Sequence, residues 1–253
     1  MASSAQSSPS CTHEAVSSPR LVVAQQDPVS REIMPVGILE SADGGFTFSY
    51  FRRVMDIGGF RPIFGFEDLE RRYTSSTLFP MFSQRLMNPK RPDYDSYLTV
   101  LGLSKGAPPL RVLGRSGGRR AGDSIFLVPE PHVAADGSTS TDFFVHGVRY
   151  KSGAEERIAA LVEDDELALR PEPANPVNPR ALLVTRDGGE LGYVPKLLLD
   201  YVHQVRDAGA MTLRVAQVNG SDTPLNLRMR VRLEGRVPSR YAPFRGEEWT
   251  TFS

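Results

Sequence analysis

The chain has 253 residues, with 30 Lys or Arg against 30 Asp or Glu, so its formal net charge is zero. This balance excludes a whole-molecule field that would draw the protein to nucleic acid or to an anionic membrane, and any such binding must come from a local patch. The single cysteine excludes an internal disulfide scaffold, and no apolar run approaches the roughly 18 residues that a membrane span needs.

The N-terminal stretch has neither the charged start nor the continuous apolar core of a secretory signal, so we expect a cytoplasmic protein with no membrane partner. Residues 1–27 are rich in Ser, Ala and Pro, and this composition predicts a disordered tail. Cys11 and His13 are spaced like a pair of metal ligands, but a structural zinc site needs about four ligands and no second pair exists. We therefore expect neither a metal nor a cofactor.

Residues 28–130 are predicted to form a mixed α/β domain. Apolar residues alternate over 36–39 and 46–50 on either side of an Asp-Gly turn, which predicts a β-hairpin. Apolar residues at three- and four-residue spacing predict helical segments over 66–73, 78–87 and 93–101.

The motifs VGILE, GGFTFSY and LFPMFSQRL in residues 33–103 resemble the small N-terminal subdomain of HipA-type toxin kinases. The resemblance implies a shape and no activity. The chain has no catalytic His-Arg-Asp motif, no Asp-Phe-Gly motif and no room for a kinase lobe.

The segment 110–123 is rich in glycine and carries four arginines, Arg111, Arg115, Arg119 and Arg120. Such a turn can place backbone amides and guanidinium groups around a phosphate, although the Gly-Lys-Ser/Thr ending of a P-loop is absent. The alternative interpretation is a solvated loop that joins a helix to the predicted strand at 124–128.

A stretch rich in Gly, Asp, Ser and Thr at 131–141 predicts a linker, and a second domain is expected over 142–248. This domain begins with a predicted strand at 143–148. A helix follows from residue 153 or 154, because Ser152 and Glu155 have the spacing of a capping box.

Three further elements are predicted in the second domain. The segments 181–184 and 191–194 flank an Asp-Gly-Gly turn and predict a hairpin. Pro195 is typical of a first helical position, and an apolar face after it predicts a helix that ends at Gly209. Two strands at 211–218 and 226–233 complete the domain.

The last of these strands alternates cleanly in polarity. Arg228, Arg230 and Arg232 share one face, and apolar residues share the other. The pattern predicts one packed face and one basic stripe.

The order of these elements, the motif Asn-Pro-x-Asn-Pro-x-Ala-Leu from Asn175, and Leu-Gly-Tyr-Val-Pro at 191–195 resemble the HIRAN domain. This module is found fused to DNA helicases and also alone in bacterial proteins. The resemblance covers 141–233 and implies an OB-like modified β-barrel with two helices. The expected fold class is therefore α+β, with a disordered tail, a mixed α/β N-terminal domain and this barrel.

The resemblance also implies a site. Arg149 would meet a phosphate and Tyr150 would stack on a base. The family loop often reads Asn-Pro-Tyr-Asp, whereas this chain has Val177, which cannot stack, and Asn178, which accepts a hydrogen bond less strongly than a carboxylate. The complete set of candidate nucleic-acid-binding residues is Arg149, Tyr150, Asn175, Val177, Asn178, Tyr193, Lys196, Arg228, Arg230 and Arg232.

Each of these residue types also has a structural interpretation. Asn175 and Asn178 can satisfy the backbone of a turn, Tyr150 and Tyr193 can belong to the rim or the core of the barrel, and the arginines can simply be solvated. Only the family resemblance favours a binding role for Arg228, Arg230 and Arg232 over the interpretation that they are simply solvated.

The function that follows is a non-catalytic module that recognises single-stranded DNA or DNA 3′ ends in DNA repair or processing, with a helicase or nuclease as a possible protein partner. The alternative is a regulatory adaptor that binds protein and no DNA, which the neutral charge and the proline-rich segments favour. We expect no enzyme, because the hydrolase activity of helicase-linked relatives belongs to domains absent here. Asp164 and Asp165 have no His or Lys constellation beside them.

Overall fold

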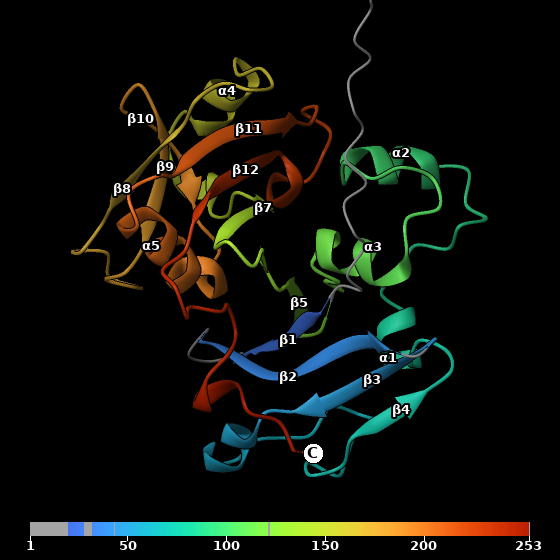
Figure 1. Cartoon of the computed structure of the whole chain (residues 1–253). Coiled ribbons are helices and arrows are strands. Elements are labelled where there is room, and N and C mark those ends of the chain that lie inside the picture. Colours follow the sequence, from blue (N-terminus) through green and yellow to red (C-terminus); the bar gives the residue numbers. More distant parts are fainter. Residues whose placement is uncertain (1–19, 28–31, 43, 121, 253) are drawn as a thin grey trace, which may run out of the picture.

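The computed structural model describes residues 20–27, 32–42, 44–120 and 122–252. In this part of the chain a five-stranded antiparallel sheet lies against a β-barrel (Figure 1). The sheet has the order β4-β3-β2-β1-β5. Its strands are β1 (Leu21–Gln26), β2 (Ile33–Ala42), β3 (Gly45–Tyr50), β4 (Tyr73–Ser75) and β5 (Ile125–Pro129).

The hairpin predicted in the N-terminal half is confirmed, because β2 and β3 pair up to Ala42 and Gly45. Strand β1 corrects the predicted tail. Residues 21–26 pair with β2 on one side and β5 on the other, and the first four of them are buried. Four consecutive apolar residues are typical of a strand that is covered on both faces. The prediction missed them because it used the average composition of residues 1–27, which is rich in Ser, Ala and Pro. The rest of the predicted tail, including Cys11 and His13, lies outside the described residues up to residue 19.

The helices of this half are shorter than predicted, and one is wrong. They are α1 (Pro80–Ser83), α2 (Tyr94–Val100) and α3 (Pro109–Ser116), with a 3-10 turn η1 (Arg52–Asp56). Residues 66–73 form no helix. Phe66 is buried instead by aromatic packing, with its ring centroid 4.6 Å from that of Phe48, so its spacing reflects tertiary contacts.

Helix α3 occupies the first half of the segment that was expected to be a glycine-rich turn or loop. Pro109 stands at its first position, Leu110 and Leu113 are buried, and Gly117 (φ 73°) ends it in a left-handed conformation. Arg111 and Arg115 are therefore helical residues.

The C-terminal half contains two sheets. One has the order β11-β12-β7-β6 and the other β10-β9-β8. Their strands are β6 (His132–Val133), β7 (Ser138–Phe144), β8 (Ala168–Pro171), β9 (Leu182–Arg186), β10 (Gly189–Tyr193), β11 (Thr212–Val218) and β12 (Met229–Arg236). The predicted linker 131–141 contains β6 and the start of β7. Its glycine signal marks a hairpin turn at Gly137 (φ 83°).

Backbone bridges close the two sheets into a barrel. His146 pairs with Tyr193 beyond the end of β7, and Glu166 pairs with Arg214 before β8. The predicted hairpin of β9 and β10 is confirmed. Two α-helices and three 3-10 turns connect the strands: α4 (Ala154–Ala159), α5 (Leu199–Asp207), η2 (Val148–Tyr150), η3 (Lys196–Leu198) and η4 (Leu225–Leu227). A further 3-10 turn, η5 (Glu247–Trp249), follows β12. The α+β class with an antiparallel barrel is thus confirmed.

Helix α4 begins where predicted, but the predicted capping box is wrong. Its N-cap is Gly153 in a left-handed conformation (φ 68°), without a side-chain cap bond. The backbone carbonyl of Ser152 accepts a hydrogen bond from Arg157 (2.5 Å) instead.

Candidate nucleic-acid interface

The exposed turn η2 carries the two residues that the family resemblance places at the centre of a site. Strand β7 ends at Phe144, and Gly147 then takes a left-handed conformation (φ 70°) that turns the chain into η2. Val148 is buried and anchors the turn, whereas Arg149 and Tyr150 are exposed, Tyr150 by 69%. The turn therefore presents a phenol ring and a guanidinium group to solvent.

These two side chains contact each other, and a second ring lies close by. The guanidinium carbon of Arg149 is 4.6 Å from the ring centroid of Tyr150, and its Nη2 donates a hydrogen bond to the Tyr150 hydroxyl. A Cβ atom on Gly147 would lie 3.0 Å from the ring of Tyr193 and 3.7 Å from that of Tyr150. The Tyr193 ring is therefore tightly packed against the backbone at Gly147, whereas the Tyr150 ring lies at an ordinary contact distance.

Tyr193 is fixed by a polar network. Its hydroxyl donates to Glu172 (2.8 Å), and Asn175 Nδ2 donates to the same carboxylate (3.1 Å). Lys151 Nζ lies 4.6 Å from the Tyr193 ring centroid and 3.1 Å from the carboxylate of Glu190. Burial disfavours the charged form of Lys151, but its hydrogen bonds to Tyr193 and Glu190 outweigh this and raise its pKa. Tyr193 therefore acts as a rigid wall beside η2.

The amide oxygens of the Asn-Pro loop are used by the loop itself. Asn175 Oδ1 accepts hydrogen bonds from the backbone N–H groups of Val177 (3.0 Å) and Asn178 (3.1 Å). Asn178 Oδ1 accepts one from the N–H of Arg180 (2.9 Å). Bonds of this kind are the ordinary role of asparagine in turns. Val177, at the tip of the loop, is 92% exposed.

The arginines of β12 do not form the solvated stripe that the alternating pattern predicted. Arg228 is 7% exposed, because its guanidinium donates to the carbonyl of Thr223 (2.7 Å). Arg230 is equally buried and forms an ion pair with Asp142. Of the three, Arg232 has the side chain that reaches solvent, with 47% of it exposed, and its Nε lies 3.3 Å from Asp142.

The candidate residues fall into two groups and one outlier. One group surrounds η2 and the Asn-Pro loop: Arg149, Tyr150, Asn175, Val177, Asn178 and Tyr193. The second group lines the main cleft: Lys196, Arg230 and Arg232. Arg228 belongs to neither, since it is buried against the loop before β12.

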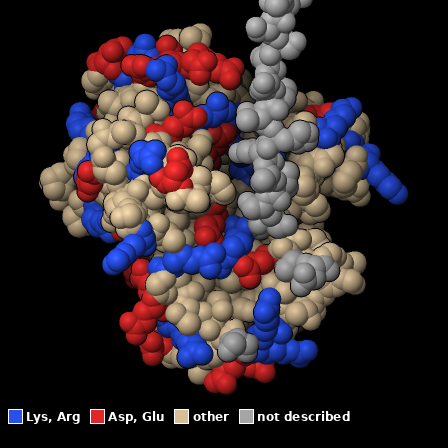
Figure 2. All heavy atoms as spheres, viewed as in Figure 1, with Lys and Arg blue, Asp and Glu red and all other residues tan. Residues whose placement is uncertain are grey.

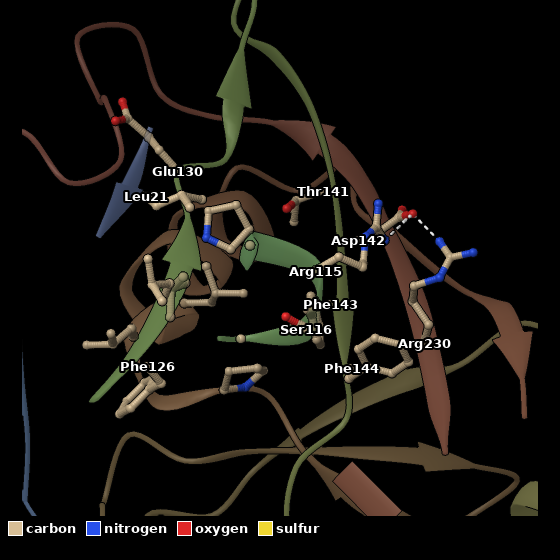
Figure 3. Close-up of a pocket in the computed structure, with 18 of the residues that line it drawn as sticks. Leu21, Arg115, Ser116, Phe126, Glu130, Thr141, Asp142, Phe143, Phe144 and Arg230 are labelled. Carbon is tan, nitrogen blue, oxygen red and sulfur yellow. Dashed lines mark hydrogen bonds and ion pairs between the residues drawn. The ribbon is translucent and has the colours of Figure 1, made fainter. Parts of the chain in front are cut away.

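The main cleft lies between the five-stranded sheet and the barrel and has a volume of about 780 Å³. Helix α3 and strand β5 line it together with β7, β12 and η3. Arg115 from α3 and Arg230 from β12 both form ion pairs with Asp142 from β7 (Figure 3). Burial alone would raise the pKa of Asp142, but the neighbouring guanidinium groups outweigh it and hold that pKa below its usual range.

Asp142 is a residue that sequence reasoning missed. Its partners lie 27 and 88 positions away in the chain, so no local spacing could reveal the cluster. The available signal was the arginine-rich segment that starts at Leu110, which the helix α3 directs into the cleft.

Two further properties concern the described part of the chain as a whole. No group of three or more His, Cys, Asp or Glu side chains within it could hold a metal ion. Among its helices, none has both the length and the apolar character needed to cross a bilayer.

Comparison with known proteins gives one family. The model of the HIRAN domain matches residues 138–238. Among solved structures, a protein from Lactobacillus plantarum is 18% identical with a TM-score of 0.33, and the match covers 40% of this chain and 100% of that one. The HIRAN domain of human HLTF is 20% identical with a TM-score of 0.31, over 42% of this chain and 84% of that one. No curated protein matches the chain. The family match does not reach residues 33–103, so their resemblance to HipA-type kinases stays a prediction.

Proposed function

We propose that this barrel, whose residues 138–238 match the HIRAN domain, a family of nucleic-acid-binding modules, binds single-stranded DNA or DNA 3′ ends without catalysis. The observation that carries the proposal is the Arg149–Tyr150 pair, with 69% of Tyr150 exposed. Aromatic faces stack on unpaired bases, and guanidinium groups bind phosphate through paired hydrogen bonds. Single strands suit such a pair because their bases are open to stacking.

The arrangement around η2 suggests how a nucleotide would lie. Arg149 covers one face of the Tyr150 ring, so a base would stack on the opposite face while the guanidinium turns to a phosphate. The Tyr193 ring packs against the backbone at Gly147 and, with Lys151 beside it, limits the space on the other side. Few phosphates are contacted in this mode, so affinity is modest and falls with added salt.

Selectivity for the 3′ end is expected to be weak. Asn178 is a neutral amide whose oxygen already accepts the N–H of Arg180, and Val177 offers no ring. A neutral hydrogen bond contributes about 0.5–1.5 kcal/mol, so blocking the 3′ hydroxyl should weaken binding by less than about tenfold.

Fluorescence anisotropy with labelled strands tests the proposal. Strands with a free 3′ end, strands with a blocked 3′ end and duplexes are compared at low salt. Tyr150→Ala should weaken single-strand binding about tenfold, because stacking contributes about 1–3 kcal/mol per base. Phe64→Ala is the matched control, an aromatic residue that is 88% exposed in the other half of the chain.

Two results would overturn the proposal. One is the absence of binding to every strand at low salt. The other is an equal affinity of the wild type and Tyr150→Ala for single strands.

One observation favours a second candidate, a regulatory adaptor that binds a protein such as a helicase or nuclease. Val177 places a 92% exposed aliphatic side chain at the tip of a proline-rich loop. A defined partner recovered by pull-down after nuclease treatment, and lost in Val177→Asn, would favour the adaptor over the DNA-binding module.

A further inference from the structure

Three guanidinium groups converge on one carboxylate in the main cleft. Arg115 Nη1 lies 3.0 Å and Arg232 Nε 3.3 Å from oxygens of Asp142, and Arg230 also pairs with this carboxylate. One carboxylate balances one guanidinium, so the cluster keeps a formal charge of about +2. It joins α3 to β7 and β12, where the two halves of the chain meet.

The lining of the cleft is basic as a whole, although the chain is neutral. Three acidic residues stand against six basic ones: Arg111, Arg115, Arg119, Lys196, Arg230 and Arg232. On the face shown in Figure 2, Lys and Arg also gather in a band between the barrel and the five-stranded sheet. A cleft lined by one sign of charge concentrates ligands of the opposite sign.

The guanidinium groups of the cluster are held in position by their neighbours. Arg230 Nη2 donates to Gln217 (3.1 Å), and a Cβ atom on Gly102 would lie 2.5 Å from the same nitrogen. The Nε of Arg230 is buried and makes no hydrogen bond within the described residues. Each guanidinium carries five N–H donors, more than a shared carboxylate can accept, so the cluster keeps donors for a further anion.

Apolar rings lie beside these charges. Phe126 and Phe143 line the cleft, and the guanidinium of Arg119 is 4.6 Å from the ring centroid of Phe126. The cleft extends to His146, which directly precedes Gly147 and so borders the η2 site. Both rings are 5% exposed, so they support the floor of the cleft, and the charges offer their donors to the phosphates of a nucleic-acid strand.

We propose that the cleft binds the phosphodiester backbone of the same single strand whose end lies at Tyr150. Arg115 and Arg232 contact the phosphates, the buried Arg230 holds Asp142 between them, and the strand passes His146 on its way from η2. This inference rests on the proposed function of the barrel and adds a second contact region that short strands cannot reach.

The test compares short and long strands. Single-strand sites on small barrels cover about 4–16 nucleotides, so labelled oligothymidylates of about 4 and about 20 nucleotides separate the barrel from the cleft. Arg232→Gln removes a half-exposed member of the cluster. Its matched control is Arg236→Gln, an exposed arginine of the same strand that pairs with Asp136 and does not line the cleft.

Arg232→Gln should weaken binding of the long strand about fivefold and lower the slope of log affinity against log salt by about 0.7, the value of one phosphate contact on a single strand. The affinity of the short strand and the behaviour of Arg236→Gln should not change. Equal effects of Arg232→Gln and Arg236→Gln on the long strand would overturn the inference, and so would an equal effect of Arg232→Gln on both strand lengths.

Three further measurements separate the alternatives. If Arg115→Gln lowers the free energy of unfolding without weakening the long strand, the cluster is only a latch between the halves and the inference is wrong. If deoxythymidine monophosphate displaces the long strand as well as an unlabelled strand does, the cleft takes free nucleotides and the inference is again wrong. If Tyr150→Ala leaves binding unchanged while Arg232→Gln still weakens the long strand, the proposed function of the barrel fails and a nucleic-acid site in the cleft remains.

Discussion

The role of each arginine in this protein depends on what its guanidinium group already contacts. Arg228 donates to the carbonyl of Thr223 and is buried, and Arg230 is buried against Asp142. Arg149 instead contacts the exposed ring of Tyr150. A guanidinium that is buried with its backbone or carboxylate acceptors stabilises the fold, whereas a partly exposed one keeps donors for a ligand.

A side chain at Gly147 should lower the stability of the protein and disturb the η2 site. Gly147→Ala places a side chain at φ 70° and 3.0 Å from the Tyr193 ring, so it should both strain the backbone and disturb the site. Gly188→Ala is the matched control, because Gly188 has φ 81° and open space around it. Each variant should lose about 1–2 kcal/mol for the backbone, and Gly147→Ala should lose more. Urea unfolding measures both, and equal losses would contradict the expected contact.

His146 should make the stability of the folded protein depend on pH. Burial and the charge of Arg119 lower the pKa of His146 to about 4. Its pKa in the unfolded chain is about 6.5, so the unfolded state binds more protons as the pH falls and the folded state loses stability between about pH 6.5 and 4. His146→Gln removes this loss, which amounts to at most about 3 kcal/mol.

The measurement is the free energy of unfolding of wild type and variant at several pH values. Above about pH 7 the difference between the two should be constant, and below it the wild type should lose stability faster. His132→Gln, at an exposed histidine, is the control and should follow the wild type. Parallel curves for His146→Gln and wild type would show that His146 protonates equally in both states.

At the scale of elements, the five-stranded sheet is a wall shared by two cores. Along β1, Leu21 and Val23 face the core of the N-terminal half, whereas Val22 and Ala24 face the core that continues into the barrel. Strand β5 alternates in the same way, with Leu127 in the first core and Phe126 in the second. Strand β5 and the first four residues of β1 are therefore continuously apolar, as expected for strands covered on both faces.

The connection from α3 to β5 depends on one buried arginine. The side chain of Arg85 is 1% exposed, donates to the carbonyl of Gly118 (2.9 Å) and pairs with Asp123 (2.5 Å). Arg85→Met leaves these acceptors without a partner and should lower the free energy of unfolding by about 3 kcal/mol. Arg91→Met is the control, because Arg91 pairs with Asp93 on the surface and should matter little. Chemical denaturation of both variants checks the contrast, and similar midpoints would refute it.

At the scale of the whole molecule, the two halves share a core and a C-terminal strap. Val22 and Phe126 of the sheet belong to the same hydrophobic cluster as Met229 of the barrel. After β12 the chain leaves the barrel and returns to the sheet, where Thr251 pairs with Phe51 (Figure 1). The division into domains over 28–130 and 142–248 stays a prediction that this shared core makes testable.

Trp249, the single tryptophan, reports on that contact. Its ring centroid lies 5.4 Å from that of Phe51 in the N-terminal half and 4.8 Å from that of Phe244. If the shared core couples the halves, urea unfolding followed by Trp249 fluorescence and by far-ultraviolet circular dichroism should give coincident transitions. Separate transitions would instead support two domains that unfold independently.

Local sequence patterns were sufficient to predict the hairpins of β2–β3 and β9–β10, the helix after Pro195, the α+β class and the likeness of residues 138–238 to the HIRAN domain. The hairpins, the helix and the fold class depend on turn residues and on apolar periodicity within a short window of sequence. The family likeness depends on short motifs that follow one another in the family's order.

The tertiary structure set the features that no short window of sequence contains. It placed β1 inside a sheet, turned the segment after Leu110 into a helix, buried two arginines of β12 and brought Arg115 and Arg230 to Asp142. Burial and ion pairing depend on partners tens of residues away, and a local pattern shows which face a side chain occupies without showing what covers that face.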